Sequence, residues 1–94
     1  ERAEQYYRDA LSLITRLGDD RERASILHSL GLVSFERGRH AEAIALYRQS
    51  LELRTVLDDQ RGMAATFNNL GTVYRDRGDY ALALEHYSRS LAIP

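Results

Sequence analysis

The sequence repeats itself at a spacing of 40 residues, and this repeat limits the possible folds more than any other feature. At this spacing Leu30-Gly31 matches Leu70-Gly71, and Arg37-Gly38 matches Arg77-Gly78. Of the 54 residue pairs compared, roughly 20 are identical, whereas chance would give about three. A chain with such a period folds as a row of similar units, each packed on the next.

Each period divides into two helices. Leu27, Leu30 and Ser34 fall on one face of a helix with 3.6 residues per turn. The chain is rich in helix-forming residues and its one proline is Pro94, so the predicted fold class is all-α. We expect five helices, over residues 2–17, 20–37, 40–57, 60–77 and 80–92.

Glycines and aspartates mark the predicted helix ends. Gly38 and Gly78 are expected to adopt a left-handed conformation just after a helix, where a Cβ atom would clash. Asp19, Asp59 and Asp79 precede the next helices and are suited to cap them.

Two further glycines, Gly31 and Gly71, fall in the middle of helices, where glycine costs about 1 kcal/mol relative to alanine. This cost, repeated in register, indicates a close helix crossing at each site. The small residues Ala43 and Ala83 on the following helices are the expected partners.

The order of these residues resembles the tetratricopeptide repeat. The matching positions are Leu27, Leu30-Gly31, Gly38, Ala43, Tyr47 and Ser50-Leu51, then Phe67, Leu70-Gly71, Tyr74, Gly78, Tyr80, Ala83, Tyr87 and Ser90-Leu91. The resemblance implies antiparallel helix pairs in a right-handed α-α superhelix. It divides the array 1–94 into the second helix of a truncated repeat (1–18) and two full repeats (19–58 and 59–94).

Two departures from the usual repeat are visible. The period is 40 rather than 34, which resembles the variant in kinesin light chains and in the arrays of bacterial STAND-type signalling ATPases. Ser34 and His40 stand where aromatic residues are usual, so the first full repeat is expected to pack less tightly. Because the helical pattern is already present at Glu1, we interpret the chain as a fragment of a larger signalling or regulatory protein.

The resemblance also implies that the first helix of each repeat builds the inner, concave wall of the superhelix. The residues beside the Leu-Gly positions would then line a binding groove. Amide and arginine groups there suit a peptide backbone and an acidic side chain, and apolar groups suit an apolar one. The candidate partner-binding residues are Ser25, His28, Leu32, Phe35, Glu36, Ala65, Asn68, Thr72, Arg75 and Asp76.

Residues for catalysis or metal binding do not converge in the sequence. There is no cysteine, and His28, His40 and His86 have no metal-ligand spacing between them, so we expect solvated or partner-facing histidines, no metal and no cofactor. No phosphate-binding loop or nucleophile motif is present, so we do not expect an enzyme.

The charge balance and hydropathy bear on the partners. The 13 basic and 14 acidic side chains nearly cancel, which argues against nucleic acid as a partner. No apolar run approaches the roughly 20 residues of a membrane span, so no membrane partner is expected. The absence of cysteine fits the cytoplasm.

Two functions follow from the repeat. The first is a non-catalytic scaffold that binds a protein or peptide in the concave groove. The alternative is a structural spacer or self-association element that forms homo-oligomers by stacking end to end through exposed repeat ends.

Overall fold

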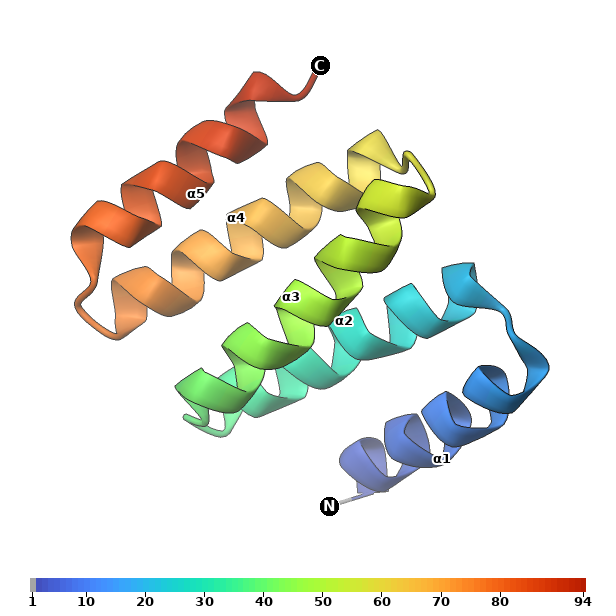
Figure 1. Cartoon of the computed structure of the whole chain (residues 1–94). Coiled ribbons are helices and arrows are strands. Elements are labelled where there is room, and N and C mark those ends of the chain that lie inside the picture. The colour runs from blue at the N-terminus through green and yellow to red at the C-terminus, as the bar shows by residue number, and fades with distance from the viewer. Residues whose placement is uncertain (1) are drawn as a thin grey trace.

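The computed structural model of the chain describes residues 2–94, the side chain of Leu17 excepted, so Glu1 lies outside the described range. Every regular element in this range is an α-helix, and the predicted boundaries are confirmed to within one residue. In Figure 1 consecutive helices run antiparallel, and the first and last helices lie at opposite ends of the array. The helices are α1 (Arg2–Leu17), α2 (Asp20–Glu36), α3 (His40–Val56), α4 (Gln60–Asp76) and α5 (Tyr80–Ala92).

The four turns between the helices are centred 20 residues apart. Gly18, Gly38 and Gly78 have φ values of 76°, 76° and 88°, which confirms the left-handed conformation expected at the last two. Asp58 occupies the remaining turn with a φ of 54°. Aspartate tolerates this region better than most residues because its short side chain can bond locally.

Aspartate side chains cap two of the helices. Asp19 accepts a hydrogen bond from the backbone N–H of Glu22 at 3.2 Å, and Asp59 accepts one from that of Gly62 at 3.0 Å. The expectation that the side chain of Asp79 caps the next helix is wrong. Asp79 holds the N-cap position of α5 without a side-chain cap bond, because its carboxylate pairs with Arg77 at 2.9 Å instead.

The core consists of two clusters that share helix α3. One cluster joins α1, α2 and α3 through Ile26, Leu27, Leu30 and Leu46, with α1 residues packed against it. The other joins α3, α4 and α5 through Ala43, Ile44, Tyr47, Leu70, Val73, Tyr74 and Ala83. The main helix contacts are between consecutive helices, so each unit is stabilised by its neighbours, as expected of a repeat array.

The two mid-helix glycines make room for aromatic rings rather than for alanines. A Cβ atom on Gly31 would lie 2.8 Å from Cε1 of Tyr47, and one on Gly71 would lie 2.7 Å from Cδ1 of Tyr87. The predicted partners Ala43 and Ala83 are therefore wrong, although the close approach itself is present. Each tyrosine lies one turn beyond the expected alanine, and its ring occupies the space that a side chain on the glycine would need.

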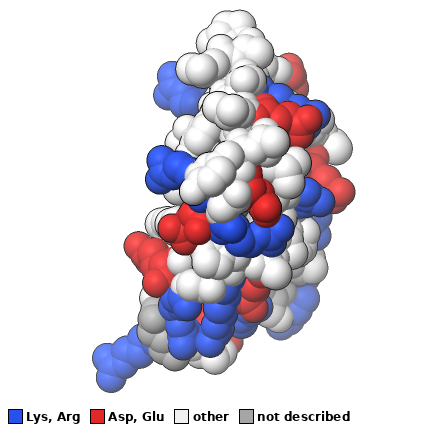
Figure 2. All heavy atoms as spheres, turned by 90° about the vertical axis from the view of Figure 1, so that its left-hand side faces the viewer, with Lys and Arg blue, Asp and Glu red and all other residues white. Residues whose placement is uncertain are grey.

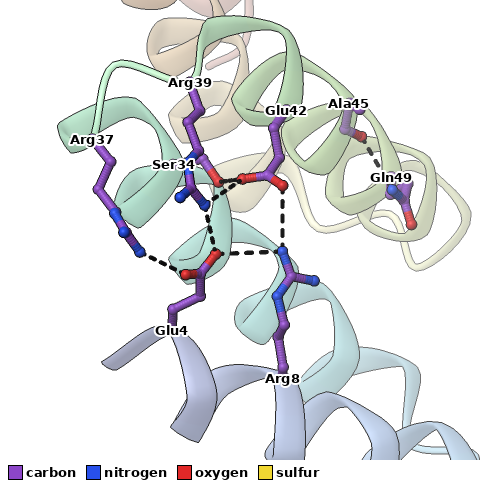
Figure 3. Close-up of polar contacts among 8 residues, drawn as sticks. All are labelled: Glu4, Arg8, Ser34, Arg37, Arg39, Glu42, Ala45 and Gln49. Carbon is purple, nitrogen blue, oxygen red and sulfur yellow. Dashed lines mark hydrogen bonds and ion pairs between the residues drawn. The ribbon is translucent and has the colours of Figure 1, made fainter. Parts of the chain in front are cut away.

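A polar network connects α1 to the end of α2 and the start of α3 (Figure 3). The carboxylate of Glu4 lies 2.6 Å from Arg37 and 3.2 Å from Arg39. Glu42 pairs with Arg8 at 3.4 Å and accepts a 2.6 Å hydrogen bond from the hydroxyl of Ser34. Ser34 is only 2% exposed, so the position that usually holds an aromatic ring is filled here by a buried hydroxyl bonded to the partly exposed Glu42.

Candidate functional site

The predicted groove residues lie on α2 and α4 and differ in exposure. Three of them are partly buried, namely His28, Phe35 and Thr72. The others are exposed: Ser25, Leu32, Glu36, Ala65, Asn68, Arg75 and Asp76. The row of predicted groove residues on each helix, called its stripe below, is therefore accessible over most of its length.

An apolar cavity joins the two stripes. It has a volume of about 80 Å³ and is lined by Leu32 and Phe35 of α2, Asn69 and Thr72 of α4, and Tyr47 of α3. Three predicted residues thus meet at one place. The other two lining residues, Tyr47 and Asn69, were not among the predicted site residues. A hollow of this size accepts part of one apolar side chain, since a small void is costly unless it is filled.

His28 belongs to a polar network beneath the cavity, so the expectation that it is solvated is wrong, whereas its role in partner binding stays a prediction. Its Nδ1 atom lies 2.9 Å from the guanidinium of Arg54, and its Nε2 atom lies 2.9 Å from the amide of Asn69. Arg54 also donates to the hydroxyl of Thr66 at 2.8 Å and to the carbonyl of Gly62 at 3.3 Å. These contacts connect α2, α3 and α4.

The network fixes the protonation of the His28 ring. A guanidinium can only donate, so Nδ1 must accept and the proton of the neutral ring lies on Nε2. The oxygen of the Asn69 amide must then face Nε2, an assignment made from hydrogen bonding. Burial, and next the nearby charge of Arg54, lower the pKa of His28 from 6.5 to about 4. Burial likewise raises the pKa of Tyr47 to about 12, so both rings are neutral near pH 7.

The two neighbouring asparagines of α4 have different roles. The side chain of Asn68 is exposed and has no hydrogen-bond partner within residues 2–94. Asn69 is half-buried and bound to His28. Asn68 is therefore free to bind another molecule, whereas Asn69 holds the floor of the cavity in place.

Charged groups flank the cavity at the ends of α2 and α4. Asp76 lies 2.6 Å from Nε2 of His40, and the His40 ring meets Phe35 edge-on at 6.3 Å between centroids. Glu36 and Arg75 form no ion pair in the part of the chain that the structure describes. Of the predicted charged residues, Arg75 and Glu36 can therefore engage an external group without first breaking an internal pair.

The helices and the metal-ligating side chains of the same range bear on membrane and metal binding. None of the five helices is long and apolar enough to span a bilayer. Within residues 2–94, the histidine and carboxylate side chains nowhere gather in threes suited to hold a metal ion.

The order of helices, the left-handed turns and the paired glycines are features of one repeat family. The family model of the tetratricopeptide repeat matches residues 1–55 and 22–94, which together cover the whole chain. The chain belongs to the tetratricopeptide repeat family. Tetratricopeptide domains generally act as protein-interaction scaffolds rather than as catalysts. Comparison with curated protein sequences returned no significant match.

Proposed function

We propose that this tetratricopeptide array binds an extended or helical peptide of a partner protein along the face formed by α2 and α4. The division into a half repeat (1–18) and two full repeats (19–58 and 59–94) is part of the proposal. So is the placing of the array in the cytoplasm, within a larger signalling or regulatory protein of the kinesin light chain or STAND type. The 40-residue spacing supports this last assignment.

The observation that carries the proposal is the cavity shared by the two helices. Its volume of about 80 Å³ suits part of one apolar side chain, which would lie against Phe35 and Leu32. Asn68, one turn from Thr72, can donate to and accept from a peptide backbone at once. Arg75, one turn beyond the cavity, can bind a carboxylate with two parallel hydrogen bonds. The expected ligand therefore has an acidic residue beside an apolar one.

Peptide display against the full chain tests the proposal. Selected peptides should be enriched in an acidic residue next to an apolar one. Asn68→Ala should weaken their binding by about two- to tenfold, since a neutral hydrogen bond contributes about 0.5–1.5 kcal/mol. Arg75→Glu should weaken it by at least about tenfold, since a hydrogen bond to a charged group contributes about 1.5–3 kcal/mol. The fold should stay intact, because both side chains are exposed.

Arg16→Glu is the matched control, since Arg16 is exposed on α1, away from the cavity. It should leave peptide binding unchanged. If Asn68→Ala and Arg75→Glu bound the selected peptides as well as the parent does, the α2–α4 face would be the wrong surface.

The alternative function, self-association, is favoured by the outer face of α5. Leu84 is 67% exposed, whereas its counterpart 40 residues earlier, Ile44, is 8% exposed beneath α4. Leu91 and Tyr80 are 87% and 67% exposed on the same helix. Figure 2 shows mixed charges over most of the viewed face and few at the upper end, toward α5. Exposed apolar surface of this kind marks an association site.

We expect the chain to dimerise or stack at concentrations near millimolar, and Leu84→Glu to abolish that association. Light scattering over a concentration series measures both. A strict monomer at the highest concentration would leave the α5 face without a role in self-association.

A further inference from the structure

A second groove lies on the opposite side of the repeat layer from the α2–α4 cavity. It has a volume of about 330 Å³, runs between α3 and α5, and has α4 as its floor. Leu51, Phe67, Leu70 and Leu82 supply apolar surface, and the charged residues are two arginines and two glutamates: Arg48, Arg89, Glu52 and Glu85. It is therefore large enough for one bulky side chain and is mostly apolar inside.

His86, which also lines this groove, is an exception to the repeat. The residue 40 positions earlier is Leu46, a core residue that is 7% exposed. His86 is equally buried at 7%, and its ring packs on Tyr74 and Phe67 with centroids 4.9 and 6.2 Å away. A histidine thus replaces a leucine at a core position, which costs free energy unless its polar atoms are bonded.

Only one of the two ring nitrogens of His86 is bonded within residues 2–94. Nδ1 lies 2.8 Å from the backbone carbonyl of Leu82. A carbonyl can only accept, so Nδ1 carries the proton of the neutral ring and Nε2 keeps a free lone pair. Every fully buried side-chain nitrogen or oxygen in the described range has a partner, so Nε2 is not fully buried, and the groove is the hollow that His86 lines. A buried ring therefore presents one fixed hydrogen-bond acceptor there.

The charged residues of the groove influence which hydrogen-bond donor can reach Nε2 of His86. Arg48 is anchored by a 2.6 Å hydrogen bond to the hydroxyl of Tyr74. The guanidinium of Arg89 lies 5.9 Å from the centre of the Phe67 ring and 3.9 Å from Glu85. Guanidinium groups attract the faces of aromatic rings, and the carboxylates of Glu52 and Glu85 balance the two arginine charges, so the groove favours no charged guest. The donor should therefore be uncharged and aromatic.

We propose that this groove binds a tryptophan side chain of a partner protein. The indole N–H would donate to Nε2 of His86, and the indole body would cover the apolar surface of Phe67 and Leu51. Tryptophan fits because its indole N–H can only donate, and the fixed lone pair on Nε2 of His86 requires a donor. This site is distinct from the peptide groove on α2 and α4, and neither depends on the other.

The test uses N-acetyltryptophanamide, titrated into the full chain labelled with ¹⁵N and followed by NMR. The resonances of the His86 ring nitrogens and of the Phe67 amide should shift. The analogue methylated on the indole nitrogen cannot donate, so it should bind about three- to tenfold more weakly, the value of one hydrogen bond. This comparison uses the unaltered chain and does not depend on any variant folding.

His86→Leu is the matched variant, because it restores the residue that the preceding repeat has at position 46. It should keep the helical fold, lose the same three- to tenfold in affinity, and no longer distinguish the two ligands. Equal binding of the methylated and unmethylated ligands by the parent chain would overturn the proposal. So would shifts confined to Leu32 and Thr72, or tighter binding of N-acetyltyrosinamide.

Discussion

Replacing Gly31 with alanine should lower the free energy of unfolding by about 1–3 kcal/mol, although alanine is normally the better helix former by about 1 kcal/mol. The added Cβ would lie 2.8 and 2.9 Å from two carbons of the Tyr47 ring. Tyr47 is only 1% exposed and is held between the His28 ring, 5.2 Å away, and the core. The ring cannot move aside, so overpacking outweighs the gain in helix propensity.

Gly71→Ala provides the comparison. Its Cβ would be just as close to Tyr87, but Tyr87 is only partly buried on the outermost helix and can turn outward. The loss of stability should therefore be smaller than at Gly31. Urea unfolding of both variants measures the difference. A Gly31→Ala protein as stable as the parent would mean that the Tyr47 ring is not held as tightly as its burial indicates.

Acidification should destabilise the fold through His28. The folded-state pKa of about 4 lies below the unfolded value of 6.5, so the folded chain binds fewer protons than the unfolded chain in this interval. The contribution of neutral His28 to the free energy of unfolding is complete above pH 6.5 and is lost as the pH falls from 6.5 towards 4. The loss should be on the order of 2–3 kcal/mol, since each unit of pKa shift corresponds to about 1.4 kcal/mol and His28 is not fully buried.

His28→Asn isolates this effect from that of the carboxylates. An asparagine oxygen can still accept from Arg54 but does not titrate, and asparagine is the residue that the second repeat has at the matching position, Asn68. Unfolding free energies of both proteins are compared across the interval. The difference between them should shrink as the pH falls below 6.5, and a constant difference would show that His28 is not the group responsible.

Local signals explain why the helices could be predicted from the sequence. Each turn contains glycine or aspartate at a 20-residue spacing, and that residue acts through its own backbone conformation. The capping aspartates act through a hydrogen bond to a backbone N–H three residues away. The prediction of a side-chain cap by Asp79 was wrong because Arg77 lies close enough to pair with its carboxylate. Helix boundaries therefore depended little on distant parts of the chain.

The candidate site was harder to predict because its parts come from three helices. The periodicity of α2 placed His28 on the groove stripe, but Arg54 reaches it from α3. Position 54 has no repeat signal, since its counterparts are Ile14 and Pro94. In the same way, Ala43 and Tyr47 share one face of α3, and only the packing decides which of them covers Gly31. Sequence periodicity gives the face of a helix but not the partner that meets it.

The polar network that joins α1 to α2 and α3 limits how the repeats of such an array can be duplicated or exchanged. Glu4, Ser34 and Glu42 correspond to Ile44, Tyr74 and Leu82 at the next junction. One junction is therefore ionic and the other apolar. A duplicated or transplanted repeat would bring leucine or tyrosine against Arg8 and Arg37, leaving their charges without partners. The order of the units is thus encoded in the side chains between them, and neighbours cannot be exchanged as equivalent modules.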